Sequence, residues 1–246
     1  MENQGSFKLE THVHTKYSHD SMLPLWLLYI KCKLQKIDYI AITEHNNIIG
    51  ALRFKEYCDK RGAKVKVIVG EEIMTSGGEI IGLFLHKEIK AGMTPEKTIA
   101  DICKQNGVVY IPHPYDEKRY KTVLKEEYIK ANLQNIDCIE CYNGRNVKPS
   151  FSEKQEGVAE RYGLTKVIGS DAHTIFEVGR NYILVDFAPD NVSAFKDAIK
   201  TARFHKSPCL HWCHWITKCD RVMKYILKGD FHALYRAINR KIRRTK

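Results

Sequence analysis

The feature that most constrains the fold is a regular alternation between short β-branched runs and longer helix-like stretches. The strand-like runs are Phe7–Val13, Tyr39–Thr43, Val65–Val69, Ile80–Leu85, Val108–Ile111, Asp137–Cys141, Val167–Gly169 and Tyr182–Phe187. The helix-like stretches are Leu25–Gln35, Ile48–Lys60, Pro95–Lys104, Thr122–Asn132, Ser152–Tyr162 and Asn191–Ala202. Such alternation predicts a parallel sheet, either doubly wound or closed into a barrel. One run, Ile80–Leu85, follows Gly77-Gly78 so closely that it could instead form a hairpin with Ile73–Thr75.

Composition places few other limits on the chain. Its 246 residues suit one large domain, and no apolar run approaches the roughly 20 residues of a membrane span. The N-terminus lacks the basic start and apolar core of a signal peptide, so we expect a cytoplasmic protein. Eight cysteines, mostly single within apolar stretches, fit that expectation. The net charge of +11 is uneven, because residues 201–246 hold 12 Lys or Arg and only 2 Asp or Glu.

Histidines and carboxylates gather where the strand-like runs end. The residues at these ends are His12, His14, Glu44, His45, Glu71, Glu72, His113, Glu140, Asp171 and His173. In a parallel barrel all these ends meet on one face, where the loops build the active site. Five of the eleven histidines occupy such positions, which is hard to explain by chance.

The types of side chain indicate a metal centre. His12 and His14 are two residues apart on a strand, so they point to the same side and can share one ion. Imidazole and carboxylate together suit Mn, Zn or Fe, whereas Mg and Ca prefer oxygen alone. The candidate ligands are too many for one ion, so two or three divalent ions fit better. Ions roughly 3.5–4 Å apart clamp a phosphoryl group for in-line displacement, which indicates hydrolysis of phosphate esters.

Taken together, the motifs resemble those of the PHP (polymerase and histidinol phosphatase) family. The runs that carry the resemblance are Leu9–Thr15, Tyr17–Asp20, Ile42–Asn46, Gly70–Glu72, Ile111–Pro114, Ile139–Asn143 and Gly169–His173. They cover about residues 7–205 in the family's order. The resemblance implies an α/β fold, a distorted (β/α)7 TIM-like barrel over residues 1–205, with a di- or trinuclear metal site and phosphoesterase activity.

The resemblance also implies roles for individual residues. The implied metal ligands are His12, His14, Glu71 and Asp171 for one ion, Asp20 and His45 with nearby His173 for a second, and Glu71 bridging toward a third reached by His113. The implied nucleophile is a hydroxide held between the metals, with Asp171, His173 and His14 central to catalysis. His19 is an alternative to Asp20, because Ser18-His19-Asp20 replaces the commoner Ser-Asp-Gly.

Further residues are expected around this centre. Glu44 stands where many members have an aspartate near the metals, and Glu79 is the nearest candidate where trinuclear members carry a fourth-strand histidine. Glu140 could be a ligand or could hold a ligand histidine in place. Arg119, Arg145 and Arg180 follow the strand ends closely enough to bind a substrate phosphate.

Residues 206–246 are predicted to form a basic, amphipathic helical extension. Its apolar residues recur at helical intervals from Trp212 to Leu227, with lysines and arginines between them. This helix could pack against the barrel, or it could lie on an anionic membrane surface or a partner. The charge also favours a nucleotide or nucleic-acid substrate among the phosphate esters.

Two other functions remain open. The chain could be a catalytically silent metal-binding module that regulates or scaffolds a partner. It could instead be a metal-dependent amidohydrolase, although those enzymes usually add a metal-bridging lysine after a middle strand, and none is found here.

Overall fold

The computed structural model describes residues 6–116, 119, 122–232 and 235. Its strands form one sheet in the order β7-β6-β5-β4-β3-β2-β1-β8-β9. The strands are β1 (Phe7–Val13), β2 (Tyr39–His45), β3 (Lys66–Thr75), β4 (Gly78–Leu83), β5 (Val108–Ile111), β6 (Cys138–Asn143), β7 (Lys166–Gly169), β8 (Tyr182–Val185) and β9 (Arg203–His205). The helices are α1 (Leu25–Gln35), α2 (Ile49–Asp59), α3 (Pro95–Lys104), α4 (Glu126–Ala131), α5 (Pro149–Arg161), α6 (Val192–Lys200) and α7 (His211–Leu227).

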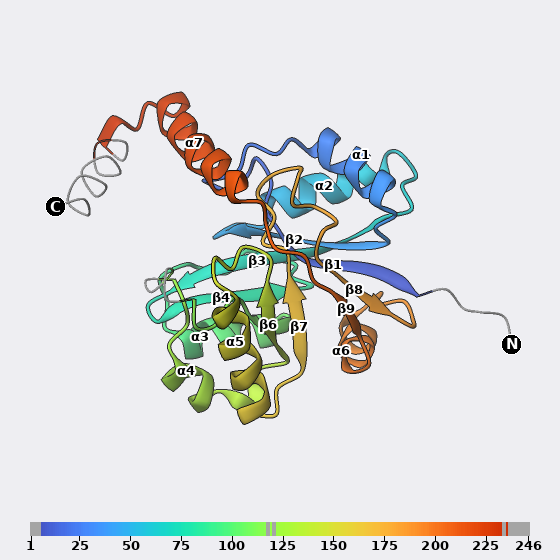
Figure 1. The fold of residues 1–246 in the computed structure, drawn as a ribbon, viewed down its shortest axis with the longest axis vertical. Coiled ribbons are helices and arrows are strands. Elements are labelled where there is room, and N and C mark those ends of the chain that lie inside the picture. The colour runs from blue at the N-terminus through green and yellow to red at the C-terminus, as the bar shows by residue number, and fades with distance from the viewer. Residues whose placement is uncertain (1–5, 117–118, 120–121, 233–234, 236–246) are drawn as a thin grey trace, which may run out of the picture.

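Strands β1 to β7 curve into a nearly closed, distorted barrel (Figure 1). Strands β1 to β3 pair in parallel, and so do β5 to β7. Strand β4 distorts the barrel because it runs antiparallel to both β3 and β5. At the seam, β1 and the segment after β7 meet through a parallel bridge between Val13 and Ala172. The α/β barrel prediction is therefore confirmed, and the β3–β4 pair is the hairpin considered from the sequence.

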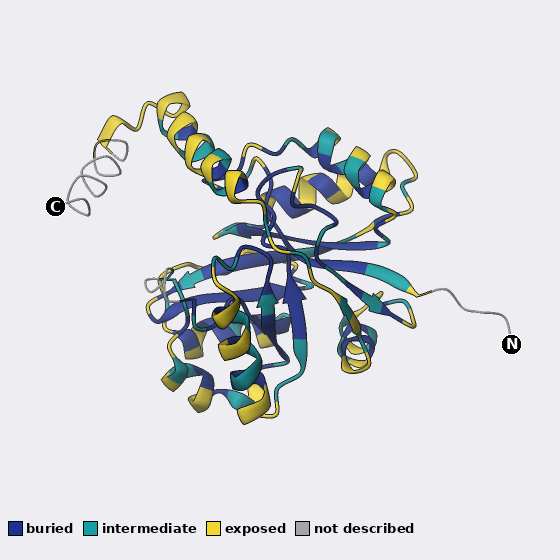
Figure 2. Ribbon diagram, viewed as in Figure 1, coloured by how far each residue is buried: buried dark blue, intermediate teal, exposed yellow. Residues whose placement is uncertain are grey.

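The helices enclose this sheet on its outer side. Figure 1 shows α1 and α2 together over the β1–β2 side, α3, α4 and α5 around β4 to β7, and α6 beside β8 and β9. The colouring by burial in Figure 2 shows β1 to β7 largely buried and β9 exposed or intermediate, while each of these helices has an exposed outer face. Two apolar clusters fill the space between the sheet and helices α1 to α5. A third joins the opposite face of the strands to α6. The mouth at the carboxyl ends of the parallel strands is thus held by a rigid frame.

Local signals in the sequence set several element boundaries. Thr94 caps α3 by accepting a hydrogen bond from Lys97 N at 3.4 Å, and Pro95 occupies the first turn. Gly78 begins β4 with a φ of +131°, and a Cβ there would overlap the backbone of Leu124. A glycine is therefore required at this turn.

Two strands extend beyond their expected ends, and this decides which side chains face the pocket. Strand β2 continues through Glu44 to His45, and β3 continues through Glu71 and Glu72 to Thr75. The backbone pairing of β2 with β3 carries both strands further than their apolar runs, with Glu44 opposite Glu71 and His45 opposite Glu72. By contrast, the expected helix Thr122–Asn132 is shorter, because Lys125 has an extended backbone and α4 begins at Glu126.

Helix α7 lies against the barrel with a largely polar face. Its buried residues are Cys213, Thr217 and Lys224. Most of its large apolar side chains stay exposed; Trp215 is 62% exposed and Leu227 is 68% exposed. The apolar stripe read from the sequence is therefore not the face that packs. None of the helices in the described part of the chain is long and apolar enough to cross a membrane.

Candidate metal centre

Strand β1 delivers two histidines to the mouth of the barrel. His12 and His14 are both fully buried, and their Nε2 atoms lie 3.1 Å apart. The Nδ1 of His12 lies 2.8 Å from Glu140 Oε1, and the Nδ1 of His14 lies 3.0 Å from Ser18 Oγ. Ser18 Oγ donates its own hydrogen to Glu44. Both Nδ1 atoms therefore donate, and in the neutral rings the two Nε2 lone pairs face each other.

Strands β2 and β3 add a histidine and a glutamate. His45 Nδ1 lies 3.1 Å from Glu72 Oε2, and this same oxygen lies 3.3 Å from His14 Nε2. The structure thus places Glu72, and not Glu71 as expected, among the histidines. Glu71 is the register partner of Glu44, and its Oε2 accepts a hydrogen bond from Ile89 N at 2.8 Å. Because neighbouring residues on a strand face opposite sides, only one of the two glutamates can enter the cluster.

His113 and Glu79 extend the cluster along β4 and β5. His113 Nε2 lies 3.0 Å from Glu72 Oε1 and 3.4 Å from Glu79 Oε2. Glu79 also approaches His45 Nδ1 at 3.7 Å. The structure therefore brings Glu79 to the place where a fourth-strand ligand was expected.

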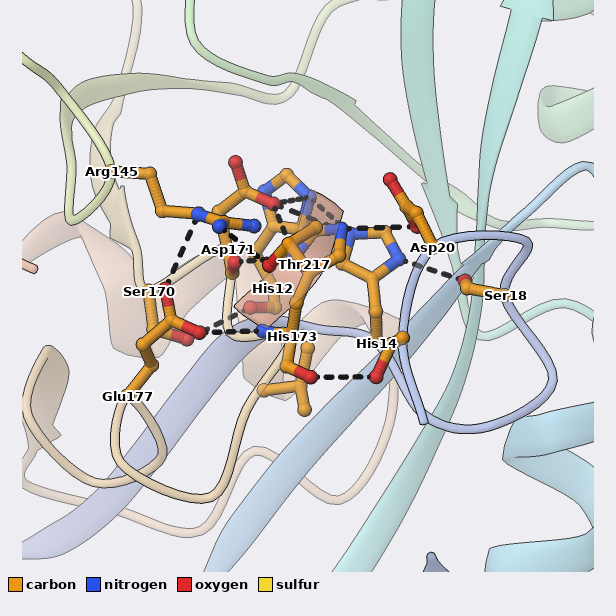
Figure 3. Close-up of polar contacts among 12 residues, drawn as sticks. His12, His14, Ser18, Asp20, Arg145, Ser170, Asp171, His173, Glu177 and Thr217 are labelled. Carbon is orange, nitrogen blue, oxygen red and sulfur yellow. Dashed lines mark hydrogen bonds and ion pairs between the residues drawn. The ribbon is translucent and has the colours of Figure 1, made fainter. Parts of the chain in front are cut away.

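The segment after β7 and the loop after β1 complete the cluster. Asp171 Oδ1 lies 3.4 Å from His14 Nε2, and Asp20 Oδ1 lies 3.3 Å from His173 Nε2 and 3.5 Å from His45 Nε2. The other nitrogen of His173, Nδ1, lies 2.8 Å from the Asp171 carbonyl oxygen, so it donates there and leaves Nε2 a lone pair. Figure 3 shows His12, His14, Asp171 and His173 gathered together with Asp20 beside them.

The spacing of these contacts fits metal binding. Ligands of one tetrahedral ion with bonds of about 2.1 Å should lie roughly 3.4 Å apart, close to the nitrogen–oxygen distances given above. Among the described residues, Asp20 Oδ1, Glu72 Oε2 and Asp171 Oδ1 are buried without a hydrogen-bond partner. A cation bound between these atoms would satisfy the unpartnered carboxylate oxygens. The groups that could hold one include His12, His14 and Asp171; His14, His45 and His173; and His45, Glu72 and Glu79.

The electrostatics of the cluster point the same way. Burial would lower the pKa of His12, but the carboxylates of Glu72, Glu140 and Asp171 raise it well above its usual value. Burial lowers the pKa of His14 well below its usual value, and the neighbouring His173 and His45 add to the effect. Despite burial, Arg119 and His12 hold the pKa of Asp171 well below its usual range. Because Nδ1 of His12 donates to Glu140, the additional proton that these carboxylates favour lies on His12 Nε2. A metal ion would displace that proton and bind the lone pair there.

Glu140 and Glu44 support the histidines from behind. Glu140 is fully buried and binds His12 Nδ1, the Tyr110 hydroxyl at 2.5 Å and His113 N at 2.6 Å. Of the two roles left open for Glu140, its hydrogen bonds favour holding a ligand histidine. Glu44 lies on the outer side of β2 and reaches His14 through Ser18. Neighbours of this kind fix the tautomer and the orientation of a metal-binding histidine.

The three arginines differ in their distance from the centre. Arg119 Nη2 contacts Asp171 Oδ2 at 2.5 Å, and Arg145 Nε contacts Glu177 Oε1 at 3.2 Å. Both line a cavity of about 690 Å³ that opens from the cluster. Arg180 instead binds Ser207 Oγ at 2.8 Å and does not line this cavity.

Two contributors were not anticipated from the sequence. Glu177 Oε2 accepts hydrogen bonds from the backbone nitrogens of His173 and Thr174, and Figure 3 shows it bracketed by Arg145 and His173. Helix α7 forms a wall of the cavity with His211, His214, Trp215, Thr217, Lys218 and Arg221. A glutamate in a loop and a polar helix face give no periodic signal by which they could have been found.

A barrel with buried histidines and carboxylates at its carboxyl mouth defines the class as a metal-binding α/β barrel. The PHP domain model matches residues 10–170, and the PHP-associated model matches residues 150–204. The chain therefore belongs to the PHP family, as the motifs suggested.

Relatives and solved structures agree with this assignment. The uncharacterized proteins MJ0417 and MJ1587 of Methanocaldococcus jannaschii are each 33% identical, over 72% and 65% of this chain and 69% and 91% of their own lengths. A two-domain protein from Bacteroides vulgatus, described as containing a predicted PHP-like metal-dependent phosphoesterase, has a similar fold. Its TM-score is 0.63 at 16% identity, over 81% of this chain and 65% of that protein.

Proposed function

We propose that this protein is a metal-dependent phosphoesterase with a site for two or three divalent ions. The observation that supports it is the convergence of three imidazole Nε2 lone pairs on buried carboxylates without hydrogen-bond partners. His12, His14 and Asp171 would hold one ion, and Asp20, His45 and His173 a second. Glu72, Glu79 and His113 would offer a third position, with Glu72 shared. Mn, Zn or Fe suits this mixture of donors.

The side chains of this chain would bind and orient the substrate. Divalent ions, when bound, would polarise the phosphate and lower the pKa of a coordinated water. Arg119, beside Asp171 at the cavity, would donate to a phosphate oxygen. Burial, followed by the nearby Arg145, lowers the pKa of His214 to about 4, so this histidine would meet the substrate uncharged. Glu140 would keep His12 turned toward the ions.

The cavity suits a small or elongated phosphate ester. Its volume of about 690 Å³ lies within the range of small-molecule sites. A phosphomonoester, a nucleotide or the end of an oligonucleotide would fit such a space, and Arg145 with Lys218 would receive additional negative charge.

Hydrolysis of chromogenic phosphate esters tests this proposal. Purified protein is stripped with a chelator, dialysed, and assayed on p-nitrophenyl phosphate and on the bis-p-nitrophenyl diester with Mn, Zn or Fe added back. We expect turnover only after a metal is restored, and metal analysis should find two or three ions per chain. A panel of nucleotides, sugar phosphates and short oligonucleotides then ranks the substrates. A protein that binds the ions but hydrolyses none of these esters would instead be the silent module.

An amidohydrolase is the less favoured reaction. The one lysine that lines the described cavity is Lys218 on α7, and its Nζ lies 4.8 Å from the centre of the Trp215 ring. No lysine of the described residues is therefore placed to bridge metals from a middle strand. Hydrolysis of N-acyl amino acids by the metal-loaded protein, without phosphate ester hydrolysis, would reverse this order.

We also propose that the outer face of α7 meets an anionic lipid surface, in a cytoplasmic protein. Trp212, Met223, Ile226 and Leu227 are exposed on this helix, and the surrounding region carries most of the excess positive charge. Exposed apolar side chains favour lipid over nucleic acid, because phosphate backbones attract charge alone. Ile226→Glu should weaken sedimentation with phosphatidylserine vesicles. Unchanged vesicle binding together with salt-sensitive oligonucleotide binding would favour nucleic acid instead.

A further inference from the structure

Helix α7 contacts the loop that joins β1 to α1 through hydrogen bonds and an ion pair. Lys224 Nζ donates to the Lys16 carbonyl at 2.6 Å, and Asp220 Oδ2 accepts from Met22 N at 3.1 Å. Between these points, Arg221 Nη2 contacts Asp20 Oδ2 at 2.9 Å. At about 100° per residue, positions 220, 221 and 224 fall on one side of the helix, which is the side turned toward the loop. These contacts join segments about 200 residues apart, and α7 begins beyond the last residue that the family models match.

The loop between β1 and α1 carries Asp20, one of the candidate metal ligands. Asp20 is buried, and its two carboxylate oxygens have different neighbours. Oδ1 faces His45 and His173, whereas Oδ2 is held by Arg221. Residues 14–24 contain neither helix nor strand, so no regular backbone pairing fixes the direction of this side chain. The contact of Oδ2 with Arg221 is shorter, at 2.9 Å, than its 3.8 Å separation from His19 Nε2.

The other ligands are oriented differently. His12 is held by Glu140 and His14 by Ser18, both within the region that the family models match. Asp20 is the described candidate ligand whose carboxylate is held from α7. The two halves of the cluster therefore depend on different parts of the chain.

We infer that Arg221 is a positioning residue for the ion held by Asp20, His45 and His173, and that α7 is a structural part of the metal centre. This inference rests on the proposed metal site. Removing a partner that orients a ligand typically lowers metal affinity about 10- to 100-fold. The ion held by His12, His14 and Asp171 needs no contact from α7. Loss of Arg221 should consequently weaken the binding of one ion and leave the binding of the other unchanged.

Metal titration of the full-length protein tests this inference without measuring hydrolysis. Chelated wild type, Arg221→Met and Asp20→Asn are titrated with Mn²⁺ and then with Zn²⁺ by calorimetry, and bound metal per chain is counted after gel filtration. We expect Arg221→Met to weaken one of the bound ions about 10- to 100-fold, as Asp20→Asn does. Lys228→Met removes an exposed positive charge from the end of the same helix and should leave both affinities unchanged.

A double variant separates positioning from a general structural role. If Arg221 acts through Asp20, the variant carrying both Asp20→Asn and Arg221→Met should bind metal as weakly as Asp20→Asn alone. Arg221→Lys should restore part of the affinity, and the chelated variants should unfold at the wild-type temperature. Unchanged affinities in Arg221→Met, additive losses in the double variant, or equal weakening of every ion would each overturn the inference. A wild type that binds no metal would instead refute the proposed function itself.

Discussion

Substitutions of the neighbouring residues Glu71 and Glu72 should have opposite effects on metal binding. Its side chain is fully buried on β3, and its Oε1 has no hydrogen-bond partner. Burial raises the pKa of Glu71 to about 8, the negative charge of Glu88 adds to this, and the Ile89 N–H opposes it. We expect Glu71→Gln to remove a buried titrating group without disturbing the cluster around Glu72.

The sign of the effect follows from the raised pKa. The folded protein binds this proton more tightly than the unfolded chain, whose carboxyl titrates near 4.5. The resulting stability is complete below that pH and is lost as the pH rises toward 8. A difference of one pKa unit corresponds to about 1.4 kcal/mol. The shift of Glu71 can therefore change the free energy of unfolding by at most about 5 kcal/mol. The protein around a newly charged Glu71 would rearrange and lower the cost of the charge. We therefore expect the free energy of unfolding to fall by only about 2–4 kcal/mol as the pH rises.

Urea unfolding followed by tryptophan fluorescence measures this change. Wild type and Glu71→Gln are compared in chelator at several values between about pH 5 and about pH 8.5. The stability of the variant relative to wild type should rise with pH across this range, and any constant cost of the amide cancels from the slope. Parallel pH curves would refute the raised pKa. Metal analysis tests which glutamate faces the histidines. Glu72→Gln should lose metal while Glu71→Gln retains it. The reverse result would refute the orientation of these two side chains on β3.

Three further predictions concern the site and the tail. Asp171→Asn should lower phosphate ester hydrolysis at least about a hundredfold with an unchanged circular dichroism spectrum, because a ligand charge is lost; unchanged turnover with metal still bound would exclude Asp171 as a ligand. Gly169→Ala should lower metal affinity, because a Cβ there would overlap the Glu140 carboxylate that holds His12, and normal metal titration would contradict this. Deleting residues 229–246, which lie mostly outside the described residues, should leave hydrolysis of a small ester nearly unchanged, whereas a large loss would show that they reach the cavity.

The barrel and most of its mouth could be predicted from the sequence because they depend on local periodicity. Strand-like runs and their polar ends predicted that His12, His14, Asp171 and His173 lie near one another, and the structure brings these four side chains together. The choice between Glu71 and Glu72 could not be made in this way. It depends on the register of β3 against β2, and the apolar run ends before either glutamate.

Helix α7 shows a second limit of sequence patterns. Apolar periodicity indicates a buried face, yet in α7 the side chains of Met223 and Ile226 are exposed and those of Thr217 and Lys224 are buried. Its hydrogen bonds and ion pairs with the loop before α1 reach residues about 200 positions away, and Thr217 accepts a hydrogen bond from Arg145, 72 positions away. No local pattern encodes partners at that separation.

At the seam of the barrel, metal ions bound as proposed would have a structural role in addition to a chemical one. At this seam the backbone is joined by His14 N to Ala172 O at 2.8 Å and by Ala172 N to His12 O at 3.2 Å. An ion bound by His12, His14 and Asp171 would span this seam and would crosslink strand β1 to the segment after β7. Amide hydrogens of β1 and of residues 170–173 should therefore exchange faster in chelator, and slow exchange that ignores metal would show that the barrel closes by itself.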